Sequence, residues 1–213
     1  MNKKLSYVCI RAQRVKGSAL PVSIEDYIQV LEFDIEYVQY VNNVPVLTGV
    51  MSSEPEPTGN SYATCKGVIP FVSSGQVSPE CEIILRAAGF TASVSGDEFI
   101  FTRSGDYIDV SICKYNNTGS QSRIRSVNSV VFTSIKIIIE SGKIPVMQFA
   151  GQGLIGGVDS TVLDTVGLSE VPEAEKIPYY TCGDVEASLL DTNWSPSKIE
   201  IEFINKVVHK PLM

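Results

Sequence analysis

Histidine and tryptophan are almost missing from this sequence, with one of each in 213 residues, His209 and Trp194. A Ser–His or Cys–His site needs an imidazole beside the nucleophile, and the single histidine lies in the C-terminal tail. No C-x-x-C pair is present, so the usual zinc ligand sets are missing as well. We therefore predict no catalytic and no metal-binding residues, and expect that the chain is not an enzyme.

Basic residues are also scarce. Lys and Arg total 17 against 24 Asp and Glu, which gives a formal net charge of −7. Binding to nucleic-acid phosphates depends on clustered Lys and Arg. Direct DNA binding is therefore disfavoured, whereas a surface past which DNA slides without sticking would suit this balance.

Long apolar runs are absent. The run from Leu5 to Ile10 is too short for the core of a signal peptide, and no stretch approaches the length of a membrane-spanning helix. We expect no export and no membrane partner. The cysteines are odd in number and scattered, which favours reduced, buried thiols in a protein made in a cytosol. They are Cys9, Cys65, Cys81, Cys113 and Cys182.

Alternation of apolar and polar residues is the main signal present. It marks strands that are buried on one face. Four segments show it: 31–37, 108–112, 134–140 and 198–203. In the second segment, Ile108, Val110 and Ile112 are expected inside, and Asp109 and Ser111 outside. The sequence predicts a mainly β, antiparallel sandwich or barrel.

Turn signals separate these strands. Ser95-Gly96-Asp97, Asn116-Asn117-Thr118-Gly119 and Ser141-Gly142-Lys143 are typical of short connections between antiparallel strands. They predict a meander of four or five strands.

One helix is predicted, from Pro79 to Ala88. Ser78 suits the N-cap, Pro79 suits the first helical position, and Gly89 supplies a C-terminal stop. We expect the chain to form one domain, 1–213, with an N-terminal arm over 1–27. Residues 52–60 and 151–178 are predicted to be long exposed loops that contact neighbouring subunits.

The motif Gly151-Gln152-Gly153-Leu154-Ile155-Gly156 matches the G-x-G-x-x-G of dinucleotide-binding proteins. However, the preceding strand arrives by a hairpin, and too few residues follow for further βαβ units. Residues 158–167 also lack the apolar stripe of a crossover helix. We interpret the motif as a flexible glycine-rich loop and expect no cofactor.

Two acidic rows, Glu32/Asp34/Glu36 and Glu200/Glu202, admit a catalytic or metal-binding interpretation. Spacing of two on a strand is also typical of the solvent face of any half-buried sheet. In a ring, such rows would line a negative channel. Trp194, with Tyr179 and Tyr180, leaves a carbohydrate-binding β-sandwich as a further alternative.

Several segments resemble tail tube proteins of long-tailed bacteriophages. Residues 78–90, Ser-Pro-Glu-Cys-Glu-Ile-Ile-Leu-Arg-Ala-Ala-Gly-Phe, resemble the family's P-E-…-L-L-R-A-A-G-F helix. Residues 106–115, 123–151 and 199–211 are similar to its later strands, in the same order, and 17–27 to its entry arm. Asp106 and Asp109 depart from the pattern.

The resemblance implies a β-sandwich or barrel with one flanking helix, whose copies form a ring, typically a hexamer. Rings would stack into the tube of a phage tail, a virion structure made in the bacterial cytoplasm that conducts DNA during ejection. DNA would be passing cargo, and other tail proteins would be partners. A related ring, such as a tail terminator or a distal tail or baseplate protein, stays open as an alternative.

Overall fold

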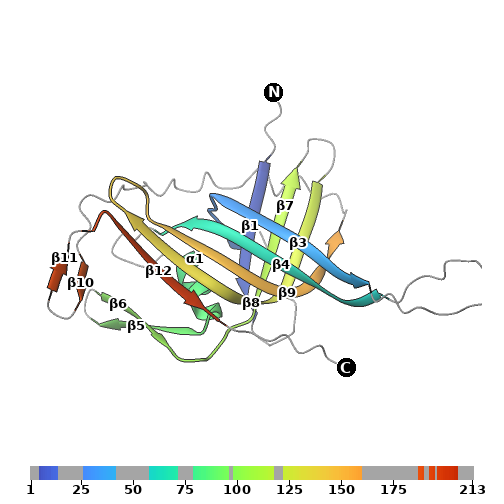
Figure 1. Cartoon of the computed structure of the whole chain (residues 1–213). Helices are drawn as coiled ribbons and strands as arrows, with labels where there is room; N and C mark the ends of the chain where they lie inside the picture. Colours follow the sequence, from blue (N-terminus) through green and yellow to red (C-terminus); the bar gives the residue numbers. More distant parts are fainter. Residues whose placement is uncertain are drawn as a thin grey trace, which may run out of the picture.

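The computed structural model describes residues 5–13, 26–41, 58–71, 79–95, 98–117, 122–159, 187–189, 192–194 and 196–205. These residues form a mainly β structure with one helix, α1 (Pro79–Ala87) (Figure 1). The strands are β1 (Leu5–Ala12), β2 (Tyr27–Ile28), β3 (Glu32–Val41), β4 (Thr58–Pro70), β5 (Phe90–Ser95), β6 (Glu98–Arg103), β7 (Val110–Asn117), β8 (Ser122–Glu140), β9 (Val146–Asp159), β10 (Ala187–Leu189), β11 (Thr192–Trp194) and β12 (Lys198–Ile204).

Eight strands form one antiparallel sheet in the order β2-β1-β7-β8-β9-β4-β3, and β12 also pairs with β8. The sheet curls into a half-barrel (Figure 1). β8 is its longest strand, with 19 residues. β9 runs along one side of β8, while β7 pairs with the first part of its other side and β12 with the last part. The predicted mainly β, antiparallel fold is confirmed.

The main core lies between one face of this sheet and α1. Alternation places Ile35 and Ile135 on that face, where each is about 1% exposed. Helix residues Ile84 and Leu85 pack against the same cluster. Each such side chain contributes roughly 1.5–3 kcal/mol when it is removed from water, so the apolar rows determine which face of each strand is buried.

Helix α1 ends one residue before the predicted boundary. Gly89 has φ +89°, the left-handed conformation that ends helices and that glycine adopts without steric cost. A Cβ at Gly89 would lie 2.8 Å from Cε1 of Tyr107, so the ring of Tyr107 also requires glycine there. The proposed N-cap, Ser78, lies outside the described residues.

The glycine-rich motif lies in a strand, so the predicted 151–178 loop is wrong over 151–159, and the remainder lies outside the described residues. β9 continues through these glycines to Asp159. Their physical role is close packing against β8. A Cβ at Gly151 would lie 2.9 Å from Cγ1 of Val130, and one at Gly153 would lie 2.6 Å from the backbone oxygen of Asn128.

Asp109 and Ser111 are buried, at 8% and 1% exposure, which contradicts the prediction that they face solvent. β7 is covered on both faces. Gln13 Nε2 donates a hydrogen bond to Ser111 Oγ at 2.8 Å, and Ser129 Oγ donates to Gln13 Oε1 at 3.4 Å. On the same side, a second small cluster contains Cys9, Cys113 and Tyr115.

Three further boundaries differ from the prediction. Residues 5–12 form β1, an interior strand of the sheet, and are not part of an arm. Residues 58–60 belong to β4 and not to the 52–60 loop, of which 52–57 lie outside the described residues. The β5–β6 hairpin forms its own small sheet, so the meander consists of β7, β8 and β9.

Four of the cysteines are buried free thiols, and Cys182 lies outside the described residues. Burial raises the pKa of Cys9 and Cys65 to about 12, and that of Cys113 to about 11. These thiols therefore stay protonated and unreactive at neutral pH. The one helix in the described part of the chain is too short to cross a membrane.

Candidate functional site

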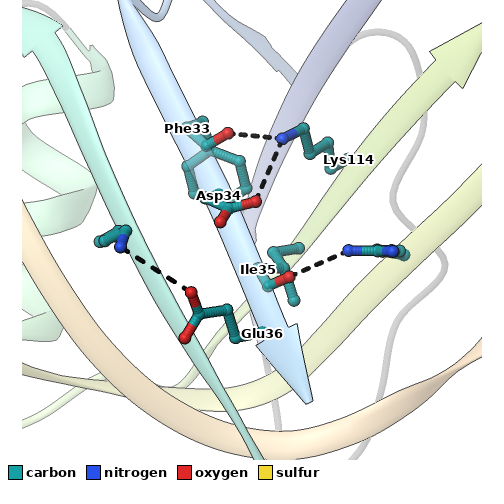
Figure 2. Close-up of polar contacts among 7 residues, drawn as sticks. Phe33, Asp34, Ile35, Glu36 and Lys114 are labelled. Carbon is teal, nitrogen blue, oxygen red and sulfur yellow. Dashed lines mark hydrogen bonds and ion pairs between the residues drawn. The ribbon is translucent and has the colours of Figure 1, made fainter.

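The end of the sheet at β3 is held by side chains from β7 and β8. Lys114 Nζ donates a hydrogen bond to the backbone oxygen of Phe33 at 2.6 Å and lies 3.5 Å from Asp34 Oδ1. Figure 2 shows Lys114 on the side of β3 away from β4. Its side chain is 18% exposed, so solvent competes little for this contact.

Two more contacts follow along the same strand. Arg125 donates to the backbone oxygen of Ile35 at 3.2 Å. Tyr37 Oη donates to the backbone oxygen of Ser126 at 3.3 Å and accepts from the Ser126 backbone N–H at 3.1 Å. Burial raises the pKa of Tyr37, and the hydrogen bond with the Ser126 backbone opposes that shift.

We call the contacts made by Lys114, Arg125 and Tyr37 the β3 latch. The last of them depends on an irregularity in β8, whose pairing with both neighbours shifts register close to Ser126. The Tyr37 hydroxyl reaches both the N–H and the C=O of Ser126 at this irregularity. The latch therefore joins β3, an end strand of the sheet, to β8 and β7, which lie three and four places away in the strand order.

The latch occupies backbone acceptors that an added strand would need. Residues two apart on a strand direct their carbonyls to the same side. The oxygens of Phe33 and Ile35 face the side on which no described strand pairs with β3, and both already accept charged donors. Such covering is one way in which proteins protect the edge of a sheet.

β12 forms a second edge. Asn205 N donates to Thr133 O at 2.7 Å and Ser141 N donates to Ser197 O at 3.0 Å, so the odd-numbered residues of β12 hydrogen-bond to β8. The backbone groups of the even-numbered residues point the other way. Within the described ranges, no strand pairs with that side of β12.

β12 is firmly attached at its C-terminal end. The ring of Phe203 packs edge-on against Phe90, with centroids 4.9 Å apart. Asn205 Nδ2 donates to the backbone oxygens of Ala88 at 3.0 Å and Phe132 at 3.2 Å. Other side chains of the strand are exposed: Ile201 to 43%, and Ile204, between Phe203 and Asn205, to 64%.

The two acidic rows lie on the same, polar face of the sheet. A shallow groove of about 490 Å³ on this face is lined by residues of five strands, with Glu32 and Asp34 on β3 and Glu202 on β12. Glu32 and Glu202 are four strand spacings apart in the register, which at roughly 4.8 Å per strand is about 19 Å measured along the curled sheet.

Lysines neutralise part of these rows. Asp34 pairs with Lys114, Glu36 with Lys66, and Glu200 with Lys136 and Lys198. The hydrogen bond from Lys136, followed by that from Lys198, lowers the pKa of Glu200 to about 2. Among the described residues, no ion pair reaches Glu32 or Glu202. The face is therefore mildly acidic, and only part of its charge is free.

Sequence reasoning missed the β3 latch. The available signal was Lys114, which continues the even-numbered row of Ile108, Val110 and Ile112 and thus places a cation on the buried side of a strand. Of the other residues considered, Trp194 lies in β11, whereas His209, Tyr179 and Tyr180 lie outside the described part of the chain. No three His, Cys, Asp or Glu residues of the described ranges are grouped as a metal site would require.

Comparison with known proteins adds no relative: no family model and no curated protein matches this chain.

Proposed function

We propose that this chain is a structural virion protein, a tail tube subunit of a long-tailed bacteriophage. Its copies associate into rings, typically hexamers, that stack into the tube through which DNA passes during ejection. One observation supports this most directly. A curled antiparallel sheet ends in β12, a seven-residue strand that is largely exposed and whose outer edge no described strand occupies.

The physical argument starts from the backbone. An unpaired strand edge carries a row of N–H and C=O groups that pair readily with another chain. A protein that keeps one edge covered, at β3, and leaves another open, at β12, is suited to controlled association. Closed rings satisfy such edges in every copy.

The charge of the polar face supports DNA as passing cargo. Each of its lysines lies within ion-pairing distance of an acidic side chain, and no lysine or arginine of the described residues pairs with Glu32 or Glu202. A basic, unpaired surface would retain phosphates. This face would not, and the net charge of −7 agrees with that.

The same edge supports a second candidate, a related ring in the phage tail such as a tail terminator or a distal tail protein. Such a protein forms one ring that does not stack. The edge of β12 would serve either case, because it concerns contacts within a ring.

Negative-stain electron microscopy of the purified protein over a concentration series, with native mass spectrometry, tests the proposal. Rings of uniform diameter that stack into tubes are the expected result. Rings that never stack would favour the second candidate. Monomers at every concentration, with no ring or tube in any field, would contradict both.

A further inference from the structure

We infer that β12 is the edge through which copies of this chain join, and that it accepts a strand of a second copy head-to-tail and not across a two-fold axis. This rests on the proposed function, because it assumes that copies associate. It adds which surface is used, which surface is closed, and what symmetry the contact has.

The first step is the availability of β12. Its even-numbered residues, Lys198, Glu200, Glu202 and Ile204, direct their backbone groups away from β8. The strand is as long as an ordinary strand of a sheet, so an added strand would find a full set of partners. Ile201 and Ile204 would lose their solvent exposure beside it.

The second step is the state of β2 and β3, the two end strands of the large sheet. β2 has two residues, too few to support a stable strand pair. β3 is long enough, but the β3 latch occupies the oxygens of Phe33 and Ile35 with donors from Lys114 and Arg125. Strand addition there would first have to displace two charged hydrogen bonds, each of which is stronger than a neutral one.

The third step concerns symmetry. If β12 paired with β12 of a second copy across a two-fold axis, its outward residues would face one another. In each register centred on the strand, Glu200 would face Glu202, or one of these glutamates would face its own copy. Like charges directly opposite destabilise a strand pair. A head-to-tail contact with a different strand avoids this, and such contacts generate rings or filaments.

The incoming strand must suit both faces of β12. On the polar face it meets Glu202, which has no ion-pair partner among the described residues, so a Lys or Arg of the second copy is favoured there. On the opposite face it meets Ile201, which is 43% exposed and favours an apolar side chain. The partner is therefore a strand of a second copy with alternating basic or polar and apolar residues.

Glu202→Pro tests the inference. The Glu202 amide points away from β8, so proline breaks no hydrogen bond between β12 and β8 but removes one that an added strand needs. We expect its association midpoint to rise about tenfold or more in native mass spectrometry and sedimentation velocity, which corresponds to about 1.4 kcal/mol. The matched variant, Glu202→Gln, retains the amide and loses only the carboxylate charge, so it should raise the midpoint by less than about fivefold, the effect of one exposed ion pair. Thermal melting of each monomer checks folding.

A second pair of variants covers the case in which proline disturbs the fold. Ile204→Lys places a cation at the same edge, whereas Leu154→Lys makes the same kind of change on β9, which pairs with β8 opposite Asn128, away from β12; Ile204 is 64% exposed and Leu154 is 49% exposed. Ile204→Lys should weaken association, and Leu154→Lys should not. Equal effects of the two, or none, would count against β12.

The outcomes separate this inference from the proposed function. If Glu202→Pro and Ile204→Lys form the same rings as the wild type, β12 is not the joining edge, and the tail tube proposal still stands. If the wild type forms open oligomers and no rings, and both variants lose these oligomers, the role of the β12 edge is supported and the tail tube proposal is overturned. A dimer that grows no further and is lost in both variants would overturn the head-to-tail arrangement.

Discussion

The Nζ atom of Lys114 lies 2.6 Å from the backbone oxygen of Phe33, which is 81 residues earlier in the chain. This single contact crosses the opening of the half-barrel. A charged donor thus holds a strand-edge carbonyl at a position that is mostly shielded from solvent. Its removal should affect both stability and the protection of the edge.

Lys114→Met retains most of the aliphatic length of the side chain and removes the donor. We expect a loss of about 1.5–3 kcal/mol in the free energy of unfolding, typical of a hydrogen bond from a charged group. Thioflavin binding on prolonged incubation should also rise, because the β3 edge opens. Urea denaturation measures the first effect. Lys66→Met is the control: Lys66 makes an exposed ion pair of 3.9 Å with Glu36, so a change within about 0.5 kcal/mol is expected.

Tyr37→Phe removes one hydroxyl and leaves both backbone groups of Ser126 without it. We expect a loss of about 0.5–1.5 kcal/mol for each hydrogen bond removed, since the hydroxyl bonds both the N–H and the C=O of Ser126 in a partly buried position. Chemical denaturation of both proteins gives the difference. A loss below about 0.3 kcal/mol would mean that water replaces the hydroxyl and that the latch does not include Tyr37.

Gly153→Ala should be among the most damaging single-methyl additions in the sheet. The new Cβ would lie 2.6 Å from the Asn128 backbone oxygen and 2.7 Å from Val127 Cγ1, and the backbone atom cannot rotate away. We expect a loss of about 1–3 kcal/mol, as for overpacked cores. Gly156→Ala is the comparison, because its nearest atoms belong to the side chains of Ser126 and Asn128, which can move. It should cost clearly less in the same thermal melts.

The Glu200 carboxylate should make the free energy of unfolding depend on pH in the acid range. Its folded-state pKa, about 2, is below the ordinary value of 4.5, so ionised Glu200 stabilises the fold above about pH 4.5. That contribution should fade as pH falls from 4.5 toward 2. Unfolding curves of the wild type and Glu200→Gln should therefore differ at pH 6 and converge near pH 2. A constant difference over this range would indicate that the ion pairs with Lys136 and Lys198 do not form in solution.

The buried thiols should not react with thiol reagents in the native protein. With pKa values of about 11 to 12, Cys9, Cys65 and Cys113 have almost no thiolate at pH 8. In a Cys182→Ser background, a disulfide reagent should label the folded protein far more slowly than the protein in urea. Mass spectrometry of peptides identifies the labelled sites. Rapid labelling of Cys9 or Cys113 in the native state would show that β1 and β7 open readily.

Alternation and local helix signals predicted most of the regular structure. The rows around Ile35, Ile135 and Phe203 led to the correct faces, and the helix was placed to within one residue. These features depend on neighbours in sequence, where periodicity is informative.

The errors arose where a distant strand decides the outcome. Gly151 and Gly153 resembled a loop because nothing near them in sequence reveals that β8 crosses at close range. Asp109 and Ser111 alternate like solvent-facing residues, yet Gln13, about a hundred residues away, covers them. The β3 latch likewise joins segments about 80 to 90 residues apart.

The pairing of β12 with β8 also has a consequence for the order of events during synthesis. β12 is translated after every other described strand, about 60 residues after β8. At typical rates of 5–20 residues per second, β8 is synthesised roughly 3–12 s before β12. During that interval, the isoleucine-rich half of β8 has β9 on one side and an open edge on the other. The surface that we propose for joining copies does not yet exist then, and assembly through it would have to follow completion of the sheet.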